Sequence, residues 1–233
     1  MEKKIILGLC TSGARLKIAV LAGGRYFQSQ KKVFNQERVL FGLVKNQLEK
    51  AGAQLRGINT VCAARGPGRF TGIRISLTLA GALKAMAGAR VYTATLFEIL
   101  ALQAFESGHF KAWAAKAGGA RLAVLLHAFK DEYFCQVFLA GGPALPRPEG
   151  EPAWLKAEEM KKLLSGLGAA FYVIADAEEA PGIYALAPEN AVKAPAALSK
   201  IIPAYIIKAA LAYKNKTLKP LYLKPAKYEL TQS

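Results

Sequence analysis

The sequence predicts a mixed α/β protein built as two lobes, and three observations lead to this fold class. Its 233 residues are long for one compact domain but comfortable for two small ones. Hydrophobic residues make up 53% of the chain and aromatic residues 9%, which is enough for a sizeable core and excludes a disordered chain. The apolar runs form three strands followed by alternating helices and strands, as in layered α/β architectures.

The first lobe is expected to open with a three-stranded meander. Short apolar runs separated by turn residues, including Gly23 and Gly24, predict strands at 4–9, 16–21 and 26–33. Asn35 is an N-cap candidate for the next helix, and Gly52 is its stop. The later elements are expected in the order helix 36–50, strand 58–64, helix 70–87, strand 90–92 and helix 95–106.

A loop-like segment at 108–119 divides the chain into expected lobes 1–107 and 108–233. The second lobe repeats the first in outline, with weaker strand signals. Its expected elements are strands 121–126 and 132–139, a Gly/Pro-rich connector at 141–152, helix 155–164, strand 170–175 and helix 196–213. The last helix and the tail could pack back on the first lobe.

The charge is large and unevenly placed. The formal net charge is +16, and residues 3–36, 50–97 and 190–228 contain no carboxylate. Such asymmetry suits an acidic partner, which could be RNA, a nucleotide or an acidic protein face. Ordinary solubility charge on solvated helix faces explains it equally well.

The cysteines and the apolar segments favour a reduced cytoplasmic protein. Cys10, Cys62 and Cys135 are odd in number and widely spaced, which suits neither a disulfide framework nor a metal site. The apolar run at the N-terminus ends after Cys10, too early for a signal sequence or a membrane span. We therefore expect no membrane association.

Two first-lobe helices are apolar over more of their circumference than one sheet can cover. In helix 36–50 the apolar positions spread over roughly 200°, and helix 70–87 is apolar on both sides. The second buried side could face another protein or the chain's own second lobe. The residues expected at a partner interface are Leu40, Phe41, Val44, Leu48, Ile75, Leu79 and Leu83.

A glycine-rich segment between strand 58–64 and helix 70–87 is the strongest local motif. It reads GPGRFTGIR, and its candidate site residues are Gly66, Pro67, Gly68, Arg69, Phe70, Thr71, Gly72 and Arg74. Glycines permit unusual backbone conformations, and a helix start with nearby arginines can bind an anion. The alternative is simply a tight strand-to-helix turn.

The segment GPGRFTGIR resembles the GPGSFTGLR signature of the TsaB (YeaZ) family. Other landmarks follow in the family's order: ILGLCTSGARLKIAV resembles the opening strand-turn-strand, RVYTATLFEILA the stretch after the signature, FKDEYFCQVF a segment of the second lobe, and PLYLKP the closing motif. The resemblance runs from Ile5 to Pro225 and so covers nearly the whole chain.

This resemblance implies an actin/Hsp70/sugar-kinase fold (ASKHA) with two RNase H-like lobes and mixed sheets. It also implies a non-catalytic subunit that pairs with a TsaD-like paralogue through first-lobe helices. With a TsaE-like ATPase, that pair would place threonylcarbamoyl on the adenosine next to the anticodon of tRNA, which this chain would meet through the complex. When alone, such a subunit is expected to form a homodimer.

The sequence departs from the active members of this fold at two turns. Active relatives carry a metal-binding Asp after the first strand, where this chain has Cys10, Thr11 and Ser12, and a thiol is a poor ligand for Mg²⁺. At the second lobe's equivalent turn the family's Asp is His127. We therefore expect no catalytic residue, no metal and no cofactor bound tightly by this chain alone, with ATP or ADP binding left to the complex.

The sequence also bears on four other functions. A metalloprotease is rejected because the chain has only His109 and His127, with no HExxH motif. A hydrolase lacks a nucleophile elbow, and Cys62 lies in an apolar strand. A stand-alone ATPase or kinase of the same fold and a basic RNA-binding module stay open, although no interleaved aromatic and basic platform of the recognition-motif type is evident.

Overall fold

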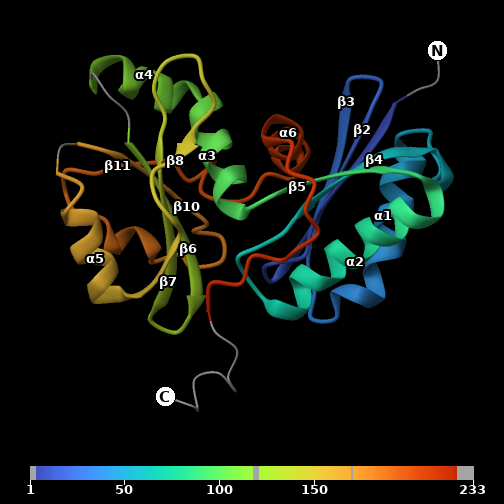
Figure 1. The fold of residues 1–233 in the computed structure, drawn as a ribbon, viewed down its shortest axis with the longest axis horizontal. Coiled ribbons are helices and arrows are strands. Elements are labelled where there is room, and N and C mark those ends of the chain that lie inside the picture. The colour runs from blue at the N-terminus through green and yellow to red at the C-terminus, as the bar shows by residue number, and fades with distance from the viewer. Residues whose placement is uncertain (1–3, 118–120, 169, 225–233) are drawn as a thin grey trace. The chain divides into compact units, whose positions relative to one another are not determined.

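The computed structural model describes residues 4–117, 121–168 and 170–224 and separates them into two compact units (Figure 1). Unit 1 comprises the described residues of Met1–Gln103 and Ile201–Pro220. Unit 2 comprises those of Ala104–Lys200 and Leu221–Ser233. The units differ from the expected division into 1–107 and 108–233 mainly at residues 201–220, which pack with unit 1.

Unit 1 is organised around a five-stranded sheet in the order β3-β2-β1-β4-β5. The strands are β1 Ile5–Cys10, β2 Arg15–Ala22, β3 Arg25–Lys32, β4 Ile58–Ala64 and β5 Arg90–Ala94. β1 pairs antiparallel with β2 and parallel with β4, and β4 pairs parallel with β5. The turn after β1, the ends of β3, β4 and β5 and the start of β2 therefore meet at one end of the sheet.

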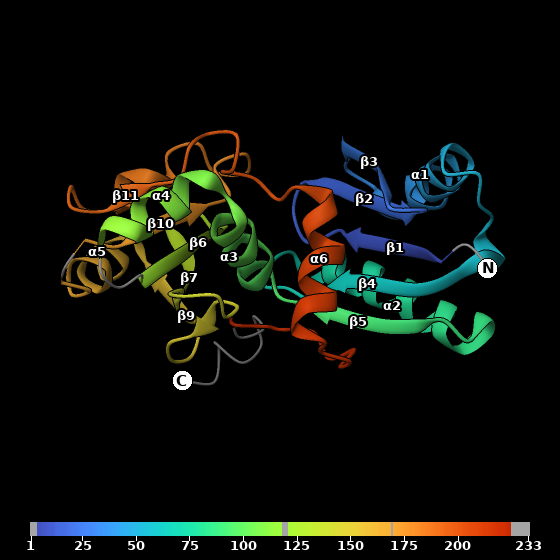
Figure 2. The same cartoon turned by 90° about the horizontal axis from the view of Figure 1, so that it is seen from above.

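Helices cover both faces of this sheet. α1 Gln36–Lys50 packs on β2 and β3, and α2 Phe70–Ala87 packs on β4, β1 and β5. α6 Pro203–Tyr213 lies on the opposite face (Figures 1 and 2). Every residue of β1 is buried, as expected for a central strand between two helical layers. Gly8 permits the close approach of α6, because a Cβ there would lie 2.7 Å from Ile207 Cγ1.

The chain after α6 remains attached to unit 1. Thr93 N donates a hydrogen bond to Asn215 O at 2.7 Å, and Thr93 Oγ1 donates to Thr217 O at 2.9 Å. Leu218 then packs against the apolar core of the unit. These contacts, together with α6, explain why residues 201–220 belong with a sheet formed about a hundred residues earlier.

Unit 2 has a second mixed sheet, in the order β11-β10-β6-β7-β8, with β9 also pairing with β7. Its strands are β6 Arg121–Phe129, β7 Glu132–Leu139, β8 Arg147–Pro148, β9 Ala153–Lys156, β10 Tyr172–Ala175 and β11 Val192–Lys193. α3 Leu96–Glu106 leads into the unit, followed by α4 Gly108–Ala117 and later by α5 Ala157–Ser165. Two 3₁₀ turns, η1 Leu55–Gly57 and η2 Ile183–Leu186, complete the elements of the two units.

Several predicted elements are confirmed at both ends, among them helices 36–50 and 70–87 and strand 58–64. The loop expected at 108–119 is wrong, because most of it forms α4. Ser107 Oγ accepts a hydrogen bond from Phe110 N at 3.1 Å, and the buried Phe110 ring lies 5.1 Å from that of Tyr172. A side-chain cap and one aromatic anchor were enough to order this segment.

Two helix starts also differ from expectation. The last helix begins at Pro203 rather than near 196, since proline suits the first helical turn and disfavours helix in the residue before it. Asn35 precedes α1 but makes no capping bond with its side chain. Instead Gln36 Nε2 donates to Gly13 O at 2.8 Å, which fixes the start of α1 to the β1–β2 turn.

Candidate functional site

The turn after β1 is where the sequence predicts a degenerate phosphate turn. Cys10 ends the strand, and Thr11 and Ser12 follow with only 0% and 2% of their surfaces exposed. Thr11 Oγ1 donates a hydrogen bond to Gly72 O, and Ser12 O accepts one from Arg69 N at 2.8 Å. Two consecutive residues of the turn are thus hydrogen-bonded to the start of α2.

The glycines of the GPGRFTG segment make this contact sterically possible. A Cβ at Gly72 would overlap the carbonyl oxygen of Thr11, and a Cβ at Gly68 would lie 2.6 Å from Ser12 O. Gly68 also has φ +153°, in the range that favours glycine. These two glycines therefore serve close packing of the loop on the turn.

The rest of the loop is held to the next strand and helix. Arg65 N donates a hydrogen bond to Ala94 O at 2.9 Å, and Leu96 N donates one to Gly66 O at 2.8 Å. The peptide bond between Gly66 and Pro67 is cis. Arg69, Phe70, Thr71 and Arg74 are exposed, and the Arg74 guanidinium lies 3.8 Å from the centre of the Phe70 ring. The exposed Arg69 and Arg74 side chains are available to an anion, and the anion site expected here stays a prediction.

Metal-binding chemistry finds little support at this end of the sheet. Thr95 N donates to Glu98 Oε2 and Glu98 N donates to Thr95 Oγ1, so the carboxylate of Glu98 caps α3. Within residues 4–117, 121–168 and 170–224, no three His, Cys, Asp or Glu side chains gather in a group that could hold a metal ion.

Comparison with known proteins shows which families this chain resembles. Residues 35–138 match the family model TsaD, tRNA N6-adenosine threonylcarbamoyltransferase. The tRNA threonylcarbamoyladenosine biosynthesis protein TsaB of Buchnera aphidicola subsp. Baizongia pistaciae (strain Bp) is 33% identical over 78 residues, covering 33% of this chain and 35% of that protein. The aligned part thus spans about a third of the curated relative.

Two crystal structures of Pseudomonas aeruginosa proteins resemble the whole chain. YeaZ has a TM-score of 0.70 at 21% identity, over 94% of this chain and 100% of the other. A protein described by its similarity to the peptidase YeaZ has a TM-score of 0.72 at 21% identity, over 95% and 100%. Together these findings show that the chain shares the fold of YeaZ over nearly its whole length and is similar to TsaB and to the TsaD family over part of it. The expected ASKHA fold with two mixed sheets is confirmed.

His127 has a structural task in unit 2. Its Nε2 lies 2.9 Å from Lys130 O, and its ring packs edge-on against Tyr133 at 5.5 Å. The strand register shifts between His127 and Phe129, just before the β6–β7 turn. His127 therefore closes a hairpin, and no residue of the described chain places a carboxylate on its ring.

The predicted partner face has to be corrected. The prediction of a partner contact is wrong for five residues, because their side chains lie in the core of unit 1. Leu48, for example, is 2% exposed. The five are Leu40, Val44, Leu48, Leu79 and Leu83. A helix lying on a twisted sheet beside another helix buries more than one stripe of side chains. This explains the wide apolar arc without a partner. Only Phe41, at 60% exposed, and the half-buried Ile75 remain accessible from the predicted set.

The exposed Phe41 borders a groove that the sequence did not reveal. The groove has a volume of about 640 Å³ and lies beside the second half of α1. Its lining combines apolar side chains, among them Phe41 and Leu55, with Lys45 and Glu49. Leu55 is exposed in η1, a segment whose turn-like sequence gives no hint of a binding surface.

A last observation concerns membranes. No helix in the described ranges of the chain is long and apolar enough to cross a bilayer.

Proposed function

We propose that this chain takes part in tRNA threonylcarbamoyladenosine biosynthesis as a non-catalytic subunit that binds and supports a TsaD-like transferase. One observation carries the proposal: the same chain aligns with a TsaB-named relative and with the threonylcarbamoyltransferase family model, on a fold shared end to end with YeaZ. The proposal includes a TsaE-like ATPase as a further member of the complex.

The turn after β1 supports a role without catalysis. Its backbone is packed against Gly68 and Gly72, and Thr11 and Ser12 are buried. Cys10 occupies the position at which a carboxylate would be needed to hold Mg²⁺. This arrangement disfavours the stand-alone ATPase, and any ATP or ADP would be bound by residues that the partner completes.

The outer sides of α1 and α2 supply the proposed partner face. Phe41 projects from α1, and the exposed Thr78 and Met86 lie on α2 with the half-buried Ile75 and Ala82 at helical spacing. Exposed apolar groups on adjacent helices can form the centre of a helix–helix interface, because small side chains allow close approach. In the absence of the transferase, the same face would pair two copies of this chain.

Co-elution with the cognate TsaD-like protein tests this face. Phe41→Asp should abolish co-elution, because a charge buried without a partner in an interface costs several kcal/mol. Leu139→Asp is the matched control, since Leu139 is 51% exposed in unit 2. Leu48→Asp is unsuitable because it would place a charge in the core of unit 1 and unfold it.

The outcomes separate clearly. Loss of co-elution with Phe41→Asp alone, with unchanged circular dichroism, supports the proposed face. Equal co-elution of both variants means that the helices do not form the interface. If the unmodified chain fails to co-elute at all, the proposed role as a partner subunit is wrong.

A further inference from the structure

The entire net charge of the described residues lies in unit 1. Unit 1 carries 19 Lys and Arg side chains against three carboxylates, those of Glu37, Glu49 and Glu98, counted over its described residues. Unit 2 carries 11 of each sign over its described residues. Two units of related architecture thus differ in charge by 16, so the fold itself does not require this surplus.

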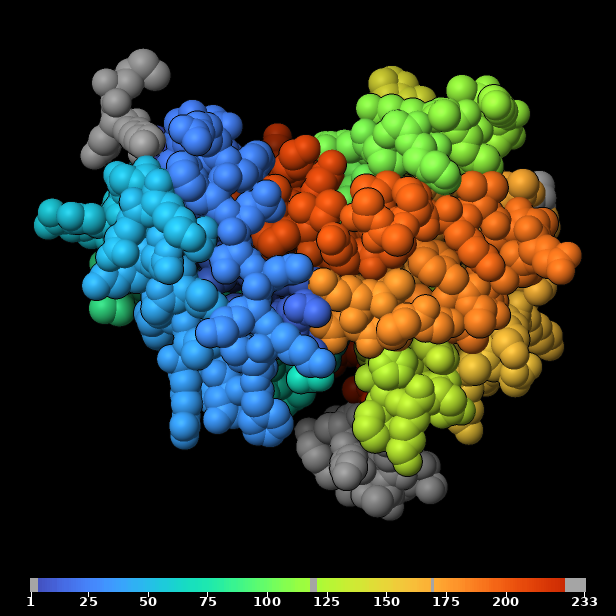
Figure 3. Space-filling view, turned by 180° about the vertical axis from the view of Figure 1, so that it is seen from behind, coloured from blue at the N-terminus to red at the C-terminus, as the bar shows by residue number. Residues whose placement is uncertain are grey.

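Six of these cations gather where the sheet of unit 1 meets the β1–β2 turn, a surface we call the basic end. Arg15 and Lys32 are direct cross-strand partners, and Lys31 is the neighbour of Lys32 on β3. The basic end consists of Arg15, Lys31, Lys32, Arg38, Arg69 and Arg74. In space-filling form, β3 and α1 make one continuous stretch of surface, coloured blue to light blue (Figure 3).

Hydrogen bonds bring the other members of the basic end to the same turn. Arg69 N donates to Ser12 O, which ties the start of α2 to the turn. Gln36 Nε2 donates to Gly13 O, which ties the start of α1, and with it Arg38, to the next residue. Four of the six side chains, those of Lys31, Lys32, Arg38 and Arg69, are exposed without a recorded carboxylate partner among the described residues.

Two exposed aromatic rings belong to the same segments of the chain as these cations. Phe34 stands between Lys32 and Arg38 in the sequence and is 97% exposed. Phe70 follows Arg69, is half exposed, and stacks against the Arg74 guanidinium. Exposed aromatic rings therefore accompany cations on the segments that reach the basic end, which the sequence did not make evident.

The combination of exposed cations and exposed aromatic rings favours RNA as the ligand over two simpler explanations. Lysines on the edge strand β3 protect a sheet against edge-to-edge pairing, but that does not account for exposed phenylalanines or for the arginines on α1 and α2. An acidic protein would pair with the cations without needing exposed rings. Single-stranded nucleic acids use both features, because phosphates pair with Lys and Arg while bases stack on aromatic faces.

We propose that the basic end of unit 1 binds a single-stranded stretch of RNA through its phosphodiester backbone and bases, without a metal ion. The inference rests on the proposed function only for the identity of the RNA, a tRNA loop. Since Thr11 and Ser12 are buried and Cys10 is no Mg²⁺ ligand, phosphate recognition falls to exposed side chains. The phosphodiester backbone of RNA can bind along such an exposed surface, whereas a single nucleotide is usually bound in an enclosed phosphate-binding turn.

Binding of an unmodified tRNA transcript to the full chain tests the proposal, with EDTA and with Mg²⁺. The double variant Lys31→Glu/Lys32→Glu should weaken binding about tenfold or more, and should reduce the dependence of log K on log salt by about one to two units. Lys161→Glu/Lys162→Glu is the matched control, with the same change in net charge on α5 of unit 2. It should change affinity less than about twofold.

Removal of the rings provides an independent test that does not alter charge. Phe34→Ala or Phe70→Ala should weaken binding of a single-stranded oligonucleotide about fivefold or more, the loss expected for one stacked base. Phe129→Ala is the control, because Phe129 is also an exposed ring near lysines but lies in the neutral unit. Near-wild-type binding by Phe129→Ala supports a localised site.

Several results would overturn the proposal. These are equal losses in the two double-lysine variants, binding that requires Mg²⁺ and is displaced by ATP, or poly-L-glutamate binding as tightly as RNA. Loss of RNA binding with intact co-elution would refute this inference alone. Intact RNA binding without co-elution would instead refute the proposed subunit role.

Discussion

The two units end their first hairpins in different ways. In unit 1 the β1–β2 turn is held by backbone packing against Gly68 and Gly72, and the surrounding cations are left exposed. In unit 2 the region of the β6–β7 turn is held by side chains, with Lys224 paired to Glu132 and placed 5.3 Å from the Trp154 ring and 5.4 Å from the Phe129 ring. Unit 1 thus leaves Lys31, Lys32, Arg38 and Arg69 exposed, whereas unit 2 pairs Lys224 within its own structure.

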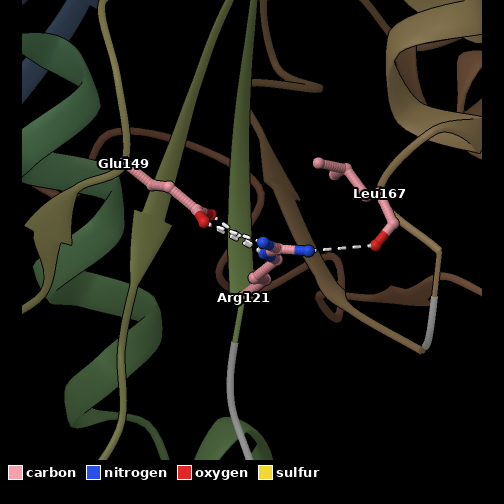
Figure 4. A network of polar contacts seen from close by, with 3 residues as sticks. All are labelled: Arg121, Glu149 and Leu167. Carbon is pink, nitrogen blue, oxygen red and sulfur yellow. Dashed lines mark hydrogen bonds and ion pairs between the residues drawn. The ribbon is translucent and has the colours of Figure 1, made fainter.

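Other charges in unit 2 follow the same pattern. Arg121 donates to both carboxylate oxygens of Glu149, at 2.8 and 2.9 Å, and to Leu167 O at 3.3 Å (Figure 4). The bond to Glu149 raises the pKa of Arg121 above its ordinary value. Such bidentate pairs orient a guanidinium through its planar geometry. Unit 2 therefore uses Arg121 and Lys224 to hold its own structure. The surplus of cations in unit 1 is a property of its surface and not of the shared architecture.

The largest expected effect concerns the turn of unit 1. Gly72→Ala should lower the free energy of unfolding by about 3 kcal/mol or more, because the new Cβ overlaps the Thr11 carbonyl in a rigid backbone contact. Gly42→Ala is the control, since Gly42 also lies in a helix but has open space around its Cβ position. It should be neutral or stabilise by up to about 1 kcal/mol. Urea unfolding of both variants measures the difference, and similar values would refute the packing role of Gly72.

A second prediction tests whether the interiors of the units are alike. Burial raises the pKa of Cys62 in β4 and of Cys135 in β7 to about 12, against an ordinary value of 9.0. Between pH 9 and pH 12 the thiols of the unfolded chain lose their protons, while the buried thiols of the folded chain keep them. The free energy of unfolding should therefore fall as pH rises from 9 toward 12, by on the order of 1 kcal/mol per thiol at about pH 10. Cys62→Ala and Cys135→Ala should each flatten this slope, and an unchanged slope would contradict the assignment.

The smallest effect concerns the charged contacts of unit 2. Lys224→Gln removes the ion pair with Glu132 and the cation–π contacts, and should destabilise the protein by a few tenths to about 1 kcal/mol. Lys161→Gln removes a more exposed pair with Glu158 and should have almost no effect. Thermal unfolding at low and high salt measures both. If Lys161→Gln lowers stability as much as Lys224→Gln does, the contacts of Lys224 stabilise the protein no more than an exposed ion pair.

The fold could be predicted in detail where local signals and burial agree. Helices 36–50 and 70–87 were bounded correctly because cap-like residues, glycine stops and apolar periodicity coincide there. α4 was missed because its order depends on Phe110 reaching Tyr172, about sixty residues away in the sequence. A contact of that range leaves no local signal.

The candidate site was predictable only in part. The GPGRFTGIR segment identified the right loop, but not that Gly68 and Gly72 serve contact with Thr11 and Ser12. The helical wheel correctly found apolar positions such as Val44, yet it could not tell a wide core contact from a partner face. Phe34 was overlooked because nothing in its sequence neighbourhood shows that the ring is left in solvent.

Reconstitution is the most direct test of the central claim that this chain supports a transferase without doing the chemistry. Purified cognate TsaD-like and TsaE-like proteins would be mixed with unmodified tRNA, threonylcarbamoyl-adenylate and ATP, with and without this chain, and threonylcarbamoyladenosine measured by mass spectrometry. We predict product only when the chain is present, and undiminished product with Cys10→Ala. Full product in its absence, or modification by this chain alone, would contradict the account.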